Sequence, residues 1–544
     1  MFKTETIRVM KNIKIYILFF LLLVGASCEL DLLDNPNSLS ENSADVDYLL
    51  NSVQISFKDF FHSASAFGMD NTRMTNMGGS TYESAYSPSS FDAIWTNAYA
   101  TFLSDVQKLI PTAEESELFY HSGMARIMEA YVLITMVDYF GDIPFSQAID
   151  KTNFNPEVDD DADVYAAALN LLDAGIADFG KKSKSTPAND LYYGDEDLWI
   201  KLANTLKLKV YIQSRLVNTN AKAQIESLIN SGTGVLISTD GEDFQFNYGT
   251  NNSSPDNRHP DFANNYVNGG SKYMANYFMN VLYREKSVVD PRMNYYFYRQ
   301  TLKISSSPID LPCAGASRPT HYPSDVPYCT VGDGYWGRDH LDDDGIPPDN
   351  KLRTIWGVYP AGGKYDDGAG KAVTQTSGGR GAGIEPIMTS SFVKFMLAEA
   401  ALTLGVNGLD ARELLEDGVR ESVTKVINSG ALDPEYTGHK GTSIDDYLDV
   451  VLGSYDAASA SDKLNVVLKE YYIALFGNGI EAYNTYRRTG LPKGFQPALQ
   501  ADPGKFYRSF IYPASYITRN LHAIQKGSPS VQVFWDTNAA GFIN

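Results

Sequence analysis

Few side chains in this sequence have the types and spacing of an active site. It has no Gly-x-Ser-x-Gly elbow for a nucleophilic serine and no His-Glu-x-x-His metal helix. It has no Walker loop either, because Gly370-Lys371 is followed by Ala372 rather than by a hydroxyl residue. The seven histidines are scattered, and none forms a pair at metal-ligand spacing. We therefore expect no catalytic residues and a protein that is not an enzyme.

Acidic residues leave one catalytic alternative open. Glycoside hydrolases use two carboxyl groups about 5–9 Å apart, and loops from anywhere in a fold can bring such a pair together. The chain has 66 Asp and Glu residues, so close pairs also arise by chance. A surface glycoside hydrolase with a loop carboxylate pair is therefore the alternative function.

One acidic loop, residues 339–345, partly matches a calcium-binding loop. When it is aligned on its glycine, Asp342 and Asp344 take positions three and five of an EF-hand loop. His340 and Lys351 then take positions one and twelve, where carboxylates are required. The loop is not an EF-hand, and we expect a solvated acidic turn. A structural cation held by Asp342 and Asp344 is the alternative, and no other metal or cofactor is predicted.

Aromatic residues are the best candidates for ligand contact. Tyr, Phe and Trp make up 12% of the chain, and many lie in loops rich in Gly, Ser and Pro, where no periodic core pattern accounts for them. A ring offers a flat apolar face to sugar C–H groups or peptide side chains, and its hydroxyl or N–H adds direction. Loop packing is the alternative for any single residue, but as a set they favour a binding surface. The predicted ligand-binding residues are Tyr82, Tyr86, Trp95, Tyr335, Trp336, Tyr359 and Tyr365.

Cys28 follows a basic head and an apolar run, 15–26, which is the order found in a secretory signal. The run is too short to span a bilayer, which needs roughly 20 apolar residues. The stretch VGASC, residues 24–28, resembles a bacterial lipobox, which predicts that Cys28 is lipidated and becomes the first residue of the mature chain. An ordinary signal peptide with a chance cysteine is the alternative.

The two remaining cysteines, Cys313 and Cys329, form an even pair in an exported protein, so we predict a disulfide. Closing this short loop would stabilise the fold by about 3 kcal/mol in the chain-entropy model. Two free buried thiols are the alternative.

Net charge excludes one class of partner. The formal net charge is −21, and removal of residues 1–27, which contain four basic groups and one acid, makes it −24. Such a surface repels phosphate backbones, so we expect no nucleic-acid partner.

The secondary structure that must position these residues is expected to be helical in two regions and rich in loops between them. Residues 92–217 and 388–490 show helical periodicity, whereas 232–387 is rich in Gly, Pro, Ser, Asp and aromatics and lacks it. In the first region we expect a helix that bears Trp95 and ends at Pro111, followed by a second helix at 114–140. Further helices are expected around Val164 to Phe179 and Leu198 to Leu206, at 390–404 and 410–428, and at 462–488, with short strands in 232–248.

Helical hairpins of about 34 residues are typical of tetratricopeptide repeats. The fold class is therefore mainly α, a tetratricopeptide-like helical repeat scaffold with a large loop-rich, partly β insertion at about 232–387. The sequence RRTGLP at 487–492 has the features of a helix end: its cations complement the helix dipole, Gly490 can adopt the left-handed cap, and Pro492 blocks continuation.

Several phrases together resemble the SusD/RagB family of nutrient-binding outer-membrane lipoproteins. The resemblance runs from Cys28 to the carboxyl terminus, and Ser391 and Tyr516 depart from it because glutamate is expected at both positions. The phrases are AYVLITMVDYFGDIPFSQA (130–148), LWIKLANTLKLKVY (198–211), GIEPIMTSSFVKFMLAEA (383–400), GNGIEAYNTYRRTGLP (477–492) and Tyr512-Pro513.

The resemblance implies a non-catalytic capture protein on the outer-membrane surface. Such proteins act as a lid over a SusC-like TonB-dependent transporter and capture oligosaccharides, or in some members peptides, for import. The acidic residues Glu29, Asp31 and Asp34 resemble the surface-export signal of lipoproteins from Bacteroidetes-like bacteria. The expected layout is a signal peptide at 1–27, a lipidated tether at 28–40 and a single SusD-like α-helical domain at 41–544.

Overall fold

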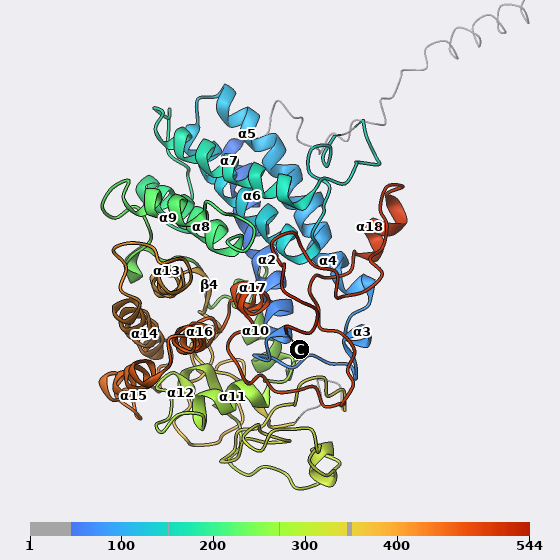
Figure 1. Cartoon of the computed structure of the whole chain (residues 1–544), viewed down its shortest axis with the longest axis vertical. Coiled ribbons are helices and arrows are strands. Elements are labelled where there is room, and N and C mark those ends of the chain that lie inside the picture. The colour runs from blue at the N-terminus through green and yellow to red at the C-terminus, as the bar shows by residue number, and fades with distance from the viewer. Residues whose placement is uncertain (1–44, 151, 271, 345–350, 544) are drawn as a thin grey trace, which may run out of the picture. The chain divides into compact units, whose positions relative to one another are not determined.

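The computed structural model describes residues 45–150, 152–270, 272–344 and 351–543, and those from Val46 onward belong to one unit. The predicted signal peptide, tether and Cys28 lie outside the described residues. Helices dominate this unit, as the sequence predicted (Figure 1).

The first half of the scaffold is a set of helices, most of which pack against α6, whereas α9 packs on α8 (Figure 1). Nearly every side chain of α6 is buried, and α7 begins where the Asp160 side chain accepts a hydrogen bond from the Ala162 N–H. Glycines let these two helices approach closely, because a Cβ on Gly175 would lie 3.1 Å from the Gly123 carbonyl oxygen. The helices are α2 (Val46–Asn71), α5 (Ser104–Glu115), α6 (Phe119–Phe140), α7 (Asp161–Phe179), α8 (Glu196–Gln213) and α9 (Ala221–Ile229).

The prediction that Pro111 ends its helix is wrong, because α5 continues to Glu115. A proline inside a helix removes one backbone hydrogen bond. Here the buried side chains of Leu109 and Ala113, on either side of the proline, anchor the turn against the core.

The second half of the scaffold begins with the predicted helical pair at 390–404 and 410–428, which is confirmed. Gly405 ends the first helix in the left-handed conformation at φ 61°. The predicted single helix at 462–488 is wrong: Gly477, at φ 101°, breaks it, and Asn478 caps the next helix. The helices are α13 (Ser390–Leu404), α14 (Ala411–Asn428), α15 (Ile444–Ala457), α16 (Lys463–Ala474) and α17 (Gly479–Thr489).

Helices α2 and α17, from opposite ends of the sequence, cross where both carry glycine (Figure 1). A Cβ on Gly68 would lie only 2.0 Å from the carbonyl oxygen of Gly479. Ser65 fastens the crossing, because its Oγ donates to the Gly477 carbonyl at 2.8 Å and accepts the Gly479 N–H at 2.9 Å.

The insertion at 232–387 contains short helices and two antiparallel strand pairs, β1 with β4 and β2 with β3. Of the strand signals in 232–248, Phe244–Asn247 forms β1, whereas residues 235–237 form no strand. Cys313 and Cys329 form the predicted disulfide beside a small core around Trp336. The elements are α10 (Pro260–Phe262), α11 (Asn276–Tyr283), α12 (Met293–Tyr296), β1 (Phe244–Asn247), β2 (Phe297–Arg299), β3 (Thr354–Trp356) and β4 (Ile384–Met388).

Short elements fill the remaining connections. They are α3 (Tyr82–Ala85), α4 (Asp92–Thr96) and α18 (Ala514–Arg519), the 3₁₀ segments Pro88–Phe91, Asp240–Glu242, Pro312–Gly315 and Ser429–Leu432, and the π-helical segments Asn97–Leu103 and Ala263–Val267.

Buried Asp138 of α6 joins the helices to the carboxyl-terminal segment. Its carboxylate accepts hydrogen bonds from Asn484 Nδ2 at 2.7 Å and Trp535 Nε1 at 3.0 Å, and it pairs with Lys209 Nζ at 3.3 Å. Four donors from separate parts of the chain, Tyr165 among them, therefore converge on one carboxylate.

The predicted helix end in RRTGLP is confirmed, since Gly490 caps α17 at φ 67°. The role of its two arginines differs from the prediction, because both are buried. Arg488 makes a bidentate pair with Glu399 at 2.9 and 2.7 Å, and the Arg487 guanidinium lies 4.7 Å from the Trp535 ring centre. A buried ion pair for Arg488 and buried hydrogen bonds for Arg487, rather than the helix dipole alone, account for these cations.

Candidate ligand-binding site

The seven predicted ligand-binding aromatics do not lie on one surface. Six are 7% exposed or less, and Tyr86 is partly buried, with its hydroxyl donating to Asp70 at 2.8 Å. Tyr82, Trp95 and Tyr359 each line a different pocket, whereas Tyr335, Trp336 and Tyr365 line none of these three.

Loop packing accounts for the three aromatics that line none of these pockets. The Tyr335 ring stacks under Arg299, whose guanidinium carbon is 4.4 Å from the ring centre. Trp336 belongs to the small core beside the disulfide, and the Tyr365 ring packs 4.8 Å from Tyr295. The sequence did not reveal these contacts because the partners come from distant parts of the insertion.

The pocket lined by Trp95 contains several aromatic side chains, and sugar rings stack on surfaces of this kind. We call it the aromatic pocket; its volume is about 260 Å³, near the lower end of ordinary ligand sites. It lies between α4, the π-helical segment that follows it, the loop after α6 and α18. The residues that define it here are Trp95, Tyr99, Phe154, Tyr516, Arg519 and Asn520.

Local structure brings three rings of this pocket together. Trp95 and Tyr99 are four residues apart on consecutive helical turns, with ring centres 4.8 Å apart. The Tyr516 ring lies 4.6 Å from Trp95 at an interplanar angle of 31°. The Asp92 carboxylate holds α18 in place by accepting the Ser515 N–H at 2.8 Å. A π-helical segment at this position is a feature often found at functional sites.

The rim of the aromatic pocket combines an apolar platform with polar groups. Phe154 is 82% exposed, so its ring is available to a ligand. Burial raises the pKa of Tyr516 from 10 to about 12, so its hydroxyl remains protonated well above neutral pH. The sequence did not predict Phe154 and Tyr516 as site residues. The one sign that could have identified Tyr516 is that it occupies a position where glutamate is expected.

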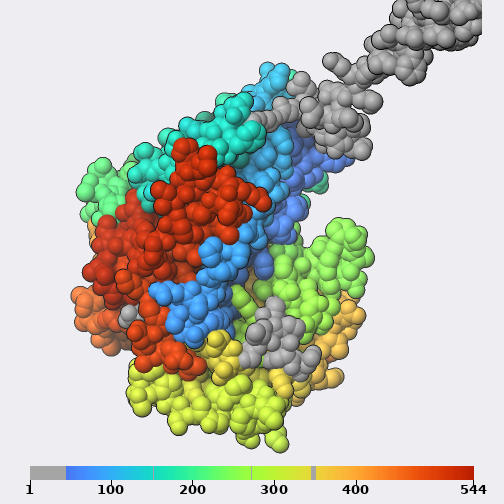
Figure 2. Space-filling model, turned by 90° about the vertical axis from the view of Figure 1, so that its right-hand side faces the viewer, coloured from blue at the N-terminus to red at the C-terminus, as the bar shows by residue number. Residues whose placement is uncertain are grey.

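A second pocket, of about 380 Å³, lies between Tyr82 and the loop 490–504. Its polar groups already bind one another: the Tyr82 hydroxyl accepts from Arg73 Nη2 at 3.0 Å and contacts His340 Nε2 at 3.1 Å. Figure 1 places α3, α4 and α18 along the same side of this unit, and Figure 2 views that side. The aromatic pocket is the stronger candidate because its rings are less committed to internal hydrogen bonds.

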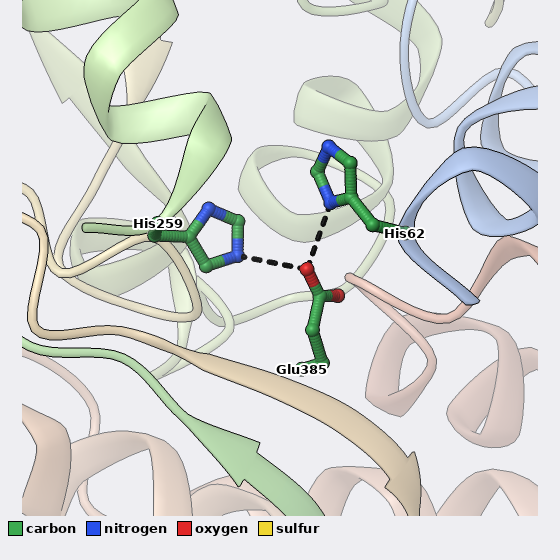
Figure 3. Close-up of side chains that lie close together, drawn as sticks. All are labelled: His62, His259 and Glu385. Carbon is green, nitrogen blue, oxygen red and sulfur yellow. Dashed lines mark hydrogen bonds and ion pairs between the residues drawn. The ribbon is translucent and has the colours of Figure 1, made fainter. Parts of the chain in front are cut away.

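Two histidines and a glutamate meet away from these pockets, at the junction of α2 and the insertion (Figure 3). His62 Nδ1 lies 2.8 Å from Glu385 Oε1, and His259 Nε2 lies 3.6 Å from the same oxygen. The Tyr248 hydroxyl donates to this oxygen at 2.9 Å. The sequence could not predict this cluster, since its members are far apart in the chain.

The hydrogen bonds of His259 disfavour a metal ion in this cluster. Its Nδ1 accepts the backbone N–H of Asp261 at 3.1 Å, so a neutral ring carries its proton on Nε2, the atom that faces Glu385. A metal ligand needs a lone pair there instead. His62 and Tyr248 form hydrogen bonds to one carboxylate, with His259 Nε2 at a longer distance, and the arrangement is that of a charge-balanced structural cluster.

The acidic loop that the sequence offered as a cation site is partly buried. Asp342 is 4% exposed, and burial raises its pKa to about 6. Its Oδ1 accepts the Asp344 N–H at 3.0 Å, and carboxylate oxygens of residues 342–344 lie within 4.8 Å of one another. A cation held by Asp342 and Asp344 stays a prediction.

Helix length and hydropathy bear on the membrane question. Within the described part of the chain, no helix is both long and apolar enough to cross a bilayer.

Comparison with solved structures shows the fold. A SusD/RagB family protein from Bacteroides thetaiotaomicron matches with a TM-score of 0.68 and 20% identity, over 91% of this chain and 100% of the other. A SusD homologue from Bacteroides vulgatus matches with a TM-score of 0.63 and 17% identity, over 91% and 98%. A chitin-binding SusD homologue from Flavobacterium johnsoniae matches with a TM-score of 0.62 and 18% identity, over 91% and 99%. No curated protein sequence matches the chain.

Two family models cover most of the sequence. The model described as "Starch-binding associating with outer membrane" matches residues 36–309, and the model described as "Susd and RagB outer membrane lipoprotein" matches residues 383–534. Together they flank the centre of the loop-rich insertion and include the helices that form the aromatic pocket. The chain therefore belongs to the SusD/RagB family.

Proposed function

We propose that this protein is a cell-surface lipoprotein that captures oligosaccharides, without cleaving them, and passes them to a SusC-like TonB-dependent outer-membrane transporter. The observation that carries the proposal is the aromatic pocket, in which Trp95, Tyr99 and Tyr516 cluster and which the exposed ring of Phe154 also lines. Membership of the SusD/RagB family supports it, as does the chitin-binding homologue from Flavobacterium johnsoniae.

The pocket suits one sugar ring of a longer chain. Pyranose C–H groups pack against aromatic faces, and sugar hydroxyls bind polar groups at the rim. A volume of about 260 Å³ has room for one sugar unit, so the neighbouring sugars of an oligosaccharide would lie outside the pocket. Because only one unit is bound, the oligosaccharide would dissociate readily. Weak, reversible capture of this kind suits a protein that hands its ligand on. A peptide held by one apolar side chain is the other ligand class that the resemblance implies.

Anchoring follows from the same proposal. Lipidation of Cys28 would hold the protein on the outer membrane, facing the cell exterior, and acyl chains contribute about 0.8 kcal/mol for each buried methylene. Residues 28–40 would then form the lipidated tether that leads to the helical domain.

Binding to a glycan and peptide array tests this function. The detergent-solubilised full chain should bind an oligosaccharide, and Phe154→Ala should weaken binding about threefold to tenfold, because one stacking surface is lost. Tyr48→Ala is the matched control, since Tyr48 is 70% exposed but does not line the pocket. Equal binding by the two variants would contradict the assignment of the site.

Chromatography of the bound glycan after long incubation tests the absence of catalysis. We expect the glycan to be recovered intact. Its conversion to shorter products would favour the glycoside hydrolase alternative.

A further inference from the structure

Charge distinguishes the aromatic pocket from the rest of this protein. Across the chain there are 66 acidic and 45 basic residues, and the net charge is −21. Of the described residues that line the pocket, Arg519 is the only charged one, and none is Asp or Glu. The pocket therefore carries a positive charge in a protein whose net charge is negative, and this positive charge would attract an acidic ligand.

Arg519 is available to a ligand. Its side chain is exposed and makes no hydrogen bond or ion pair with the described residues. The acidic residues nearby have other partners: Asp159 accepts the N–H groups of Phe145 and Ser146 at 2.7 and 3.1 Å, and Glu157 lies 3.5 Å from His522. Asp92 accepts the Ser515 N–H. The guanidinium therefore retains its full set of donors.

A second polar group in the same pocket lacks a partner. Tyr516 is 7% exposed, and its hydroxyl makes no hydrogen bond with the described residues. A buried hydroxyl without a partner costs free energy, and a ligand oxygen would relieve that cost. Arg519 and Tyr516 lie three residues apart on α18, so they occupy neighbouring turns of one helical face.

We propose that the aromatic pocket prefers an acidic sugar of the hexuronic acid class, whose carboxylate pairs with Arg519 while its ring stacks on the exposed ring of Phe154. This inference rests on the proposed function. A planar guanidinium matches the two oxygens of a carboxylate, and charge-assisted pairs of this kind are stronger than hydrogen bonds between neutral groups. A neutral sugar would stack in the same way but would leave the guanidinium to water.

A structural role for Arg519 is the competing explanation. Cations near the carboxyl end of a helix complement its dipole, and Arg519 is the last residue of α18. This role predicts an effect on stability but no discrimination between ligands. Sugar selectivity therefore separates the two explanations.

The test compares tri-galacturonic acid with its carboxyl-reduced, neutral counterpart, by calorimetry on the detergent-solubilised full chain. Because Arg519 is exposed and its pair would be screened by water, we expect the acidic trisaccharide to bind about threefold to tenfold more tightly at low salt. This preference should shrink in 0.5 M NaCl. Arg519→Gln should abolish the preference, because it lowers the affinity for the acidic trisaccharide much more than that for the neutral one. Arg380→Gln, at an exposed arginine that does not line the pocket, should retain it.

Equal affinity for both trisaccharides, or an acid preference that survives in Arg519→Gln, would overturn the inference. Failure of both to bind would overturn it too. In that last case the proposed function still stands if another glycan binds and Phe154→Ala weakens that binding, so the two failures are distinguishable.

Discussion

His62 and Glu385 show how one ion pair can set a pH dependence. Burial by itself lowers the pKa of His62, but the carboxylate of Glu385 outweighs burial and raises this pKa from 6.5 to about 9. Burial likewise opposes the charged form of Glu385, yet the His62 charge holds its pKa below the ordinary value. In the folded state the pair is thus ionised across the neutral range.

The sign of the resulting effect follows from linkage. A histidine whose folded pKa is raised contributes stability that is complete below pH 6.5 and is lost as the pH rises to about 9. We expect His62→Gln to lower the free energy of unfolding by about 2 kcal/mol at pH 6 and by clearly less at pH 9.5. Urea unfolding at both pH values measures this difference.

A histidine outside this cluster provides the control. The side chain of His522 is 44% exposed and pairs with Glu157. Because exposed ion pairs contribute little, His522→Gln should change stability little at either pH. A destabilisation by His62→Gln that is the same at pH 6 and pH 9.5 would contradict the ion-pair explanation.

At the scale of single residues, the sequence predicted chemistry better than location. The pairing of Cys313 with Cys329 could be predicted from the chain. Which aromatics line a pocket could not, because exposure depends on partners far away in sequence: Trp95 meets Tyr516, whereas Tyr365 is covered by Tyr295.

At the scale of elements, the crossing of α2 and α17 makes a sharp prediction. Alanine normally stabilises a helix relative to glycine by about 1 kcal/mol. At Gly68 the added Cβ would lie 2.0 Å from the Gly479 carbonyl oxygen, so the two backbones must move apart. We expect Gly68→Ala to lower the free energy of unfolding by about 1–3 kcal/mol, the usual cost of overpacking.

Gly453 is the matched control for this substitution. It lies inside α15, is exposed, and has no atom within 4 Å of a Cβ built on it. Gly453→Ala should therefore stabilise the protein by about 0.5–1 kcal/mol in the same urea titration. Similar effects of the two substitutions would show that the crossing is looser than described.

Helical periodicity predicted the positions of most long elements but not every boundary. The pair α13 and α14 follows from apolar spacing with a glycine turn between them. The break between α16 and α17 was missed because the apolar stripe continues across it, through Leu475 and Ile480. Tertiary packing overrides such local signals, as it does where α5 continues past Pro111.

At the scale of the whole molecule, Cys28 carries the prediction about location. Cys28→Ala should move the protein from the membrane fraction to the soluble fraction, because no acyl chain could then attach. Cell fractionation in a strain without the proposed partner transporter measures this change. Cys313→Ala is the control and should stay membrane-bound, whereas full membrane retention of Cys28→Ala would refute lipid anchoring through this residue.

Family and fold class could be predicted from the sequence because scaffold phrases are local. AYVLITMVDYFGDIPFSQA contains the second half of α6 and its end, and GNGIEAYNTYRRTGLP contains α17 and its cap. The detail of the insertion could not be predicted, because its short strands pair across long separations: Phe246 of β1 lies opposite Glu385 of β4.

The carboxylate of Asp138 has a consequence for how the chain acquires its structure. Its partner Trp535 is 397 residues away in sequence, and Ser65 meets the backbone of Gly477 across 412 residues. Contacts between residues so far apart in sequence close very long loops and form slowly. The first helices therefore cannot cover α6 completely until residues 477–535 have been synthesised. For a chain exported as proposed above, this delay would leave time to cross a membrane before the tertiary structure forms.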